Sequence, residues 1–97
     1  MVQQLKALVV EDDPDITTVI VESLAAAGFE VTSAADGRSA IEKAAEISPD
    51  LVTLDLTLPK MDGIEVCRRL RETSDCYIVM ISARADEIDR LIGLEVG

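Results

Sequence analysis

Short aliphatic runs that alternate with helical segments limit the fold of this chain more than any other feature. Such runs cover residues 5–10, 29–34, 51–56 and 77–82. The second run alternates with polar residues, whereas the other three are mainly apolar apart from Lys6, Thr53, Asp55 and Ser82, as in strands buried on both faces. Strands of this kind lie in parallel sheets that helices cover on each side. We therefore predict an α/β fold with a doubly wound parallel sheet.

Helix signals occupy the intervals between the runs. Asp13 and Pro14 are typical of an N-cap and a first helical position, and Gly28 is typical of a helix end. Further helices are predicted over residues 39–47, 64–71 and 86–96. In the first helix the apolar positions at helical spacing are Ile16, Val19, Ile20 and Leu24, and in the second the inward positions are Ala40, Ile41, Ala44 and Ala45.

Composition indicates one small domain with an aliphatic core and an acidic surface. Of 97 residues, 48 % are apolar but only 2 % are aromatic, so the core is built from Val, Ile, Leu and Ala. A net charge of −10 disfavours direct contact with DNA and suits a basic partner or a divalent cation. Cys67 and Cys76 lack zinc-type spacing, and no apolar stretch is long enough to span a membrane. We expect reduced thiols in a cytoplasmic domain without a membrane partner.

Acidic residues stand where the first and third strands end. Glu11, Asp12 and Asp13 follow the first run, and Asp55 lies near the end of the third. If these strands are parallel neighbours, their carboxylates meet at one edge, where ligands bind in such sheets. Clustered carboxylates repel one another unless a proton or a cation lies among them, and hard oxygen ligands favour Mg²⁺. Ser82 ends the fourth strand at the same edge.

This edge could support phosphoryl chemistry. An aspartate can accept a phosphoryl group as an acyl phosphate, Mg²⁺ screens the repulsion, and the Ser82 hydroxyl could bond to the new oxygens. Each residue alone has a simpler interpretation. Asp13 caps a helix, Glu11 and Asp12 alone could be a solvated run that complements the helix dipole, and Asp55 could be a turn residue. Only the joint pattern favours a functional site.

Three stretches in order, 9–13, 54–63 and 81–83, make the chain resemble a bacterial two-component response regulator receiver domain. The resemblance implies the flavodoxin-like strand order 2-1-3-4-(5) and phosphoryl transfer from a sensor histidine kinase. It also implies Asp55 as the phosphoacceptor and Ser82 as the switch hydroxyl. The implied Mg²⁺ ligands are Asp55, Asp12 directly, Glu11 through water and the backbone carbonyl of Thr57. The resemblance implies a phosphoacceptor regulator with self-phosphorylation chemistry only, and not an enzyme.

The family pattern continues beyond Gly97 with a fifth strand, a lysine followed by proline, and a last helix. Residues 1–97 therefore resemble a receiver domain without its C-terminal strand and helix. The segment 81–97 is most similar to receivers that precede a winged-helix domain, which implies transcription control and DNA contact only through an effector domain outside this chain. A fourth strand at the sheet edge, without charge or proline, predicts self-association as a dimer.

Two other functional classes are considered. A hydrolase of the haloacid-dehalogenase type also forms an aspartyl phosphate, but it needs an acid two places after the nucleophile, where this chain has Thr57. A protein-interaction module that is never phosphorylated is the alternative that the lysine's absence favours. Treatment with a small phosphodonor and Mg²⁺ distinguishes a switch, an enzyme and an interaction module.

Overall fold

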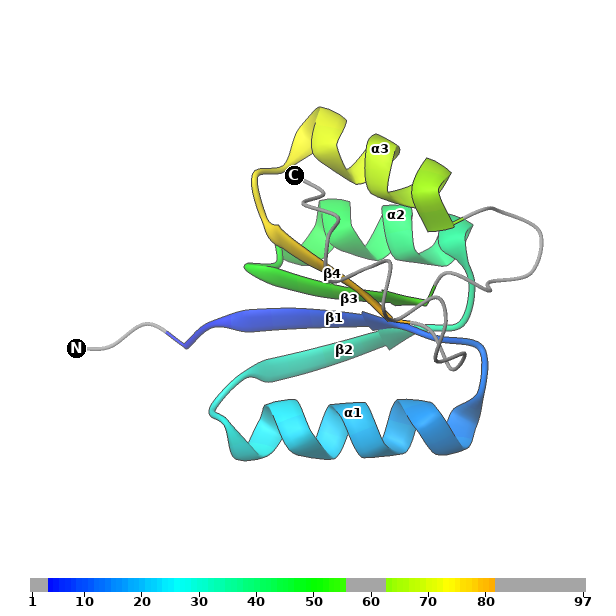
Figure 1. Cartoon of the computed structure of the whole chain (residues 1–97). Coiled ribbons are helices and arrows are strands. Elements are labelled where there is room, and N and C mark those ends of the chain that lie inside the picture. Colours follow the sequence, from blue (N-terminus) through cyan, green and yellow to red (C-terminus); the bar gives the residue numbers. More distant parts are fainter. Residues whose placement is uncertain (1–3, 56–62, 82–97) are drawn as a thin grey trace.

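Strands and helices alternate along the chain, as the sequence predicts. The computed structural model describes residues 4–55 and 63–81. The elements are β1 (Lys6–Val10), α1 (Pro14–Ala26), β2 (Glu30–Ala34), α2 (Gly37–Ile47), β3 (Leu51–Asp55), α3 (Gly63–Thr73) and β4 (Tyr77–Ile81) (Figure 1). The strands form one parallel sheet in the order β2-β1-β3-β4. The predicted fold class and strand order are confirmed, while Ser82 and the predicted helix 86–96 lie outside the described residues.

The register of the central strands brings their carboxyl ends together. Val10, the last residue of β1, is aligned with Leu54 of β3 and with Ala34, the last residue of β2. Both β1 and β3 are buried over their last four residues, which agrees with their aliphatic sequences. Residues that follow Val10 and Leu54 therefore meet at one edge of the sheet.

Side-chain caps set the starts of the first two helices. The Asp13 side chain caps α1 and Pro14 is its first residue, as predicted. The Asp36 side chain accepts a hydrogen bond from the Ser39 N–H at 2.8 Å, so α2 begins at Gly37, before the predicted start. Gly28 follows α1 with φ of 101°, a left-handed conformation that favours glycine.

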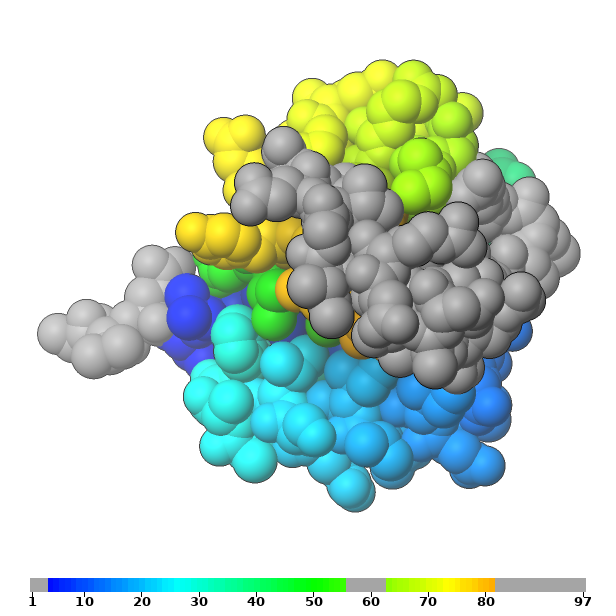
Figure 2. Space-filling view, viewed as in Figure 1, coloured from blue at the N-terminus to red at the C-terminus, as the bar shows by residue number. Residues whose placement is uncertain are grey.

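The two faces of the sheet are covered unequally by the described residues. Figure 1 shows α2 and α3 on one face and α1 on the other. In the space-filling view, α1 and α3 form opposite flanks of the molecule (Figure 2). The core lies mainly between the sheet and the α2–α3 layer. Its buried members are Leu8, Val10, Ala34, Ala40, Ala44, Val52, Leu54, Val66, Cys67, Leu70, Cys76 and Met80.

Three side chains are more exposed than the sequence predicts. Among the described residues of α1 none is buried, and Val19 is 63 % exposed, because the main contacts of this helix with the described elements are along β1 and β2. Ala45 is exposed because α2 turns Ala40 and Ala44 inward, and the next residue lies about 100° around the helix. Tyr77, the first residue of the strand that the sequence predicts over residues 77–82, is 80 % exposed.

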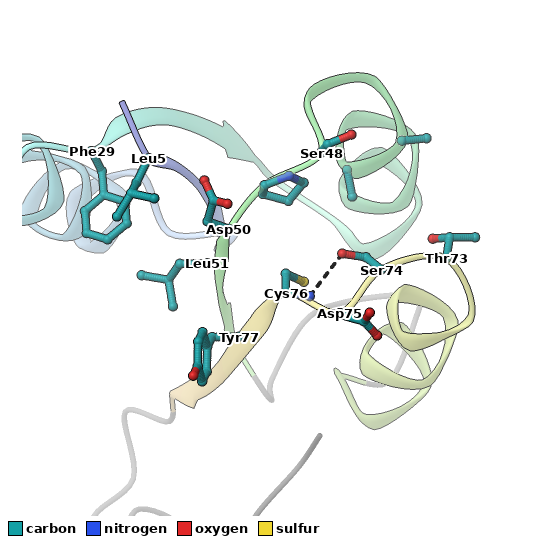
Figure 3. A pocket seen from close by; sticks show the side chains of 13 residues that line it. Leu5, Phe29, Ser48, Asp50, Leu51, Thr73, Ser74, Asp75, Cys76 and Tyr77 are labelled. Carbon is teal, nitrogen blue, oxygen red and sulfur yellow. Dashed lines mark hydrogen bonds between the residues drawn. The ribbon is translucent and has the colours of Figure 1, made fainter. Parts of the chain in front are cut away.

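A hollow of about 860 Å³ lies at the amino ends of the strands (Figure 3). Leu51 and Tyr77 line it as the first residues of β3 and β4, and Leu5 lines it just before β1. The Cys76 N–H donates to Ser74 Oγ at 3.1 Å beside it. Cys67 and Cys76 are both free and buried in the described chain. Within residues 4–55 and 63–81, no helix is long and apolar enough to span a membrane.

Candidate functional site

Three carboxylates meet at the carboxyl edge of the sheet. One oxygen from each of Glu11, Asp12 and Asp55 lies within 4.8 Å of the other two. Glu11 and Asp55 are each only 6 % exposed, whereas Asp12 is exposed. The sequence predicted this cluster, and the structure brings these three residues together. Ser82 and the carbonyl of Thr57, also predicted for the site, lie outside the described residues.

The sheet itself positions the two buried acids. The Glu11 N–H donates to the carbonyl oxygen of Ala34 at 3.0 Å, which extends the pairing of β1 with β2 by one residue. Asp55 is the last residue of β3 and is aligned with Ile81 of β4. Because both acids follow aligned residues of adjacent strands, their side chains reach the same edge. Rigid strands therefore determine the spacing of the cluster.

Burial and mutual repulsion raise the pKa of Glu11. Its pKa rises from an ordinary value of 4.5 to about 7, first because burial penalises the charged form. The Asp13 N–H, which donates to Glu11 Oε2 at 3.1 Å, lowers this pKa. The nearby Asp55 and Asp12 carboxylates raise it further. The cluster consequently retains a proton near neutral pH, or admits a cation in its place.

The donor set fits Mg²⁺. Mg²⁺ prefers carboxylate and water oxygens and is usually bound by one or two carboxylates, with its other positions left for water or phosphate. Glu11 and Asp55 supply buried carboxylates, while the exposed Asp12 leaves one side of the cluster open to solvent. A hollow of about 330 Å³ adjoins Glu11 and Asp12 on this side.

Hydroxyl groups beside the cluster were not identified from the sequence. Thr17, Thr18 and Ser33 line the adjoining hollow. The Thr17 hydroxyl donates to the carbonyl oxygen of Asp13 at 2.9 Å, four residues before it on α1. Thr17 could have been identified from its position four residues after the predicted cap at Asp13, since residues four apart share a helix face.

With the fold and the carboxylate cluster described, comparison with known proteins defines the class. Residues 7–97 match the response regulator receiver domain family, and the chain belongs to this family. It is 44 % identical over 93 residues to the alkaline phosphatase synthesis transcriptional regulatory protein PhoP of Bacillus subtilis. It is 45 % identical over 92 residues to the DNA-binding response regulator MtrA of Mycolicibacterium smegmatis. These alignments cover 95 % of this chain but only 39 % and 40 % of those proteins.

Solved receiver structures share the fold. The BeF3-activated N-terminal receiver domain of Klebsiella pneumoniae RstA is 36 % identical with a TM-score of 0.81, and the match covers 95 % of this chain and 79 % of that one. CheY in the CheX-CheY-BeF3-Mg+2 complex from Borrelia burgdorferi is similar to this chain. That match has 30 % identity and a TM-score of 0.77, and it covers 91 % of this chain and 70 % of the solved one.

Proposed function

We propose that this domain accepts a phosphoryl group on Asp55 and is thereby switched between two states of an interaction surface. The observation that supports this most directly is the cluster of Glu11, Asp12 and Asp55 oxygens at the carboxyl edge of the sheet. Two buried acids whose oxygens lie close together at this edge are costly for a fold that does not use them. Membership of the receiver family supports the same assignment.

The chemistry assigns separate roles to the acids. A carboxylate oxygen of Asp55 forms a bond to phosphorus while the N–P bond of a phosphohistidine breaks, and the electron pair of that bond stays on the imidazole. Bound Mg²⁺ neutralises the charge that the carboxylates and the phosphoryl oxygens bring together. Asp12 would bind the metal directly and Glu11 through water. By resemblance, the Thr57 carbonyl completes the metal ligands and Ser82 bonds to the phosphoryl group.

The partners follow from the same proposal. The phosphoryl donor is a sensor histidine kinase, and the output is transcription control through a winged-helix effector domain outside this chain. The names of the matched relatives, a transcriptional regulatory protein and a DNA-binding response regulator, support this role. DNA contact belongs to the effector domain, since residues 1–97 carry a net charge of −10. A cytoplasmic location follows from that role.

Self-association is a further part of the proposal. Among the described residues β4 is an edge strand, and its Val79 is 48 % exposed. An uncharged edge strand is a template for pairing with another chain. Sedimentation should show dimers that a Val79→Lys variant reduces, because a charge on an edge strand opposes pairing. Unchanged dimerisation in that variant would exclude this edge as the interface.

Intact-mass measurement with a small acyl phosphate and Mg²⁺ tests the function. We expect the mass of one phosphoryl group to be added, with the donor consumed in proportion to protein. Continuous donor consumption over many turnovers would instead support a phosphatase. Absence of any modification would support the alternative, a protein-interaction module that is not phosphorylated. Omission of Mg²⁺ is the matched control and should abolish most of the reaction.

A further inference from the structure

The carboxylate cluster is held in part by a residue that does not belong to it. We propose that Asp13 is a positioning residue for the metal site: its side chain caps α1 and so keeps its own N–H on the Glu11 carboxylate. This inference rests on the proposed function, because the site that Asp13 serves is the one assigned to Mg²⁺.

The Asp13 side chain and backbone face different partners. Its N–H donates to Glu11 Oε2 at 3.1 Å. Its carboxylate Oδ1 instead accepts from the N–H groups of Asp15 at 2.9 Å and Ile16 at 3.4 Å, as an N-cap does. The exposed Asp13 side chain is therefore bonded to the first turn of α1, and it is not one of the three acids that form the cluster.

The backbone of Asp13 is restrained by its conformation and by the bonds to its carbonyl oxygen. Its φ of −88° and ψ of 117° are extended, the conformation that a following proline favours at this position. Its carbonyl oxygen accepts from both the N–H and the hydroxyl of Thr17, each at 2.9 Å. The cap, Pro14 and Thr17 together restrain the backbone of Asp13, and with it the direction of the Asp13 N–H. That N–H is consequently directed at Glu11 before any ligand binds.

Pre-orientation of Glu11 has a consequence for metal binding. A buried carboxylate that already has its donor loses less side-chain freedom when a cation binds than one that must first be ordered. Loss of the cap would loosen the first turn of α1 and release the N–H from Glu11. Mg²⁺ affinity should then fall, although no metal ligand has been changed.

Two substitutions at one position separate the cap from the charge. Asp13→Asn and Asp13→Ala remove the same negative charge, but asparagine is a good N-cap and alanine is not. Asp36→Ala is the matched control, because Asp36 caps α2 and is not one of the clustered acids. Mg²⁺ dissociation constants, thermal unfolding and hydrogen exchange of the residue 13 amide are measured in each variant.

We expect Asp13→Ala to bind Mg²⁺ roughly fivefold more weakly than Asp13→Asn, the factor that a typical N-cap contribution gives when it is fully coupled to the site. The residue 13 amide should exchange faster in Asp13→Ala than in Asp13→Asn. Asp36→Ala should lower the melting temperature while its Mg²⁺ affinity stays that of the parent chain. A merely structural role for Asp13 would not produce this separation.

Equal Mg²⁺ affinity in Asp13→Asn and Asp13→Ala would overturn the inference and leave the proposed function intact. An equal loss of affinity in Asp36→Ala would also overturn it, because the effect would then be general destabilisation. If the parent chain itself does not bind Mg²⁺, the metal site of the proposed function fails and the role of Asp13 fails with it.

Discussion

The two edges of the sheet both contain acidic residues, but those acids have different neighbours. At the amino edge, the Asp50 carboxylate accepts from the Lys6 N–H at 2.8 Å, and the Asp50 N–H donates to the Lys6 carbonyl at 2.8 Å. At the carboxyl edge, the oxygens of Glu11 and Asp55 lie close to one another and to those of Asp12. At the amino edge the carboxylate of Asp50 joins two strands, whereas at the carboxyl edge the carboxylates place negative charges close together.

This difference separates structural acids from functional ones. Asp50 is exposed and accepts a backbone N–H from the neighbouring strand beside the hollow in Figure 3, so the fold stabilises its carboxylate. Buried acids that face one another raise the free energy of the folded state until a proton or a cation joins them. The carboxyl edge is therefore the part of the fold whose energy depends on a ligand.

The largest expected difference between the edges is in phosphorylation. Asp55→Asn should abolish it completely, because an amide of nearly the same shape cannot form an acyl phosphate. Asp50→Asn is the matched control at the amino edge and should be modified to the same extent as the parent chain. Intact mass after incubation with an acyl phosphate and Mg²⁺ gives both results. Full modification of the Asp55→Asn variant would refute the assignment.

The pH dependence of stability should distinguish the edges next. Because the pKa of Glu11 is about 7 in the folded state and near 4.5 when unfolded, the folded chain binds more protons between these values. The contribution of Glu11 to the free energy of unfolding is therefore present below pH 4.5 and is lost as the pH rises to 7. The loss is at most about 3 kcal/mol without metal. Urea unfolding in a chelator measures it.

The Glu11→Gln variant isolates the contribution of Glu11 to the pH dependence of stability, because a glutamine side chain does not titrate. Subtracting its pH profile from that of the parent chain should leave a difference that grows as pH rises through this range. Asp50→Asn should keep the parent slope. A Glu11→Gln profile parallel to that of the parent would contradict the raised pKa.

Mg²⁺ should stabilise the fold through the carboxyl edge. A cation that binds only the folded state adds about 2.7 kcal/mol to the free energy of unfolding at roughly a hundredfold excess over its dissociation constant. Asp12→Asn should lose most of this gain, whereas Asp50→Asn should retain it. Thermal unfolding with and without Mg²⁺ is the measurement. A melting temperature that Mg²⁺ does not move would contradict the metal site.

The smallest effect is expected at the amino edge itself. Asp50→Ala removes the acceptor of the Lys6 N–H and should lower the free energy of unfolding by about 1 kcal/mol. Mg²⁺ affinity should not change, since Asp50 lies at the opposite ends of the strands. Denaturant unfolding and a Mg²⁺ titration of the same variant give both quantities. Weaker Mg²⁺ binding in this variant would show that the two edges are coupled.

The sequence was sufficient to predict the carboxylate cluster, because the alignment of parallel strands determines which residues meet at their carboxyl ends. The residues after Val10 and Leu54 meet at one edge if β1 and β3 are parallel neighbours. The start of α1 was predictable because aspartate is a typical N-cap and proline a typical first helical residue. Val19 was not predictable, because its exposure depends on how much of one face α1 covers. Likewise, no local pattern shows that the Asp13 N–H reaches Glu11.

Locating the phosphoryl group on the chain tests the central claim most directly. After incubation with an acyl phosphate and Mg²⁺, borohydride reduces an aspartyl phosphate, and peptide mass spectrometry identifies the reduced residue. We expect reduction at Asp55 alone, with Asp12, Asp13 and Asp50 unchanged. Modification at another residue, or none at a concentration of Mg²⁺ that stabilises the fold, would contradict it.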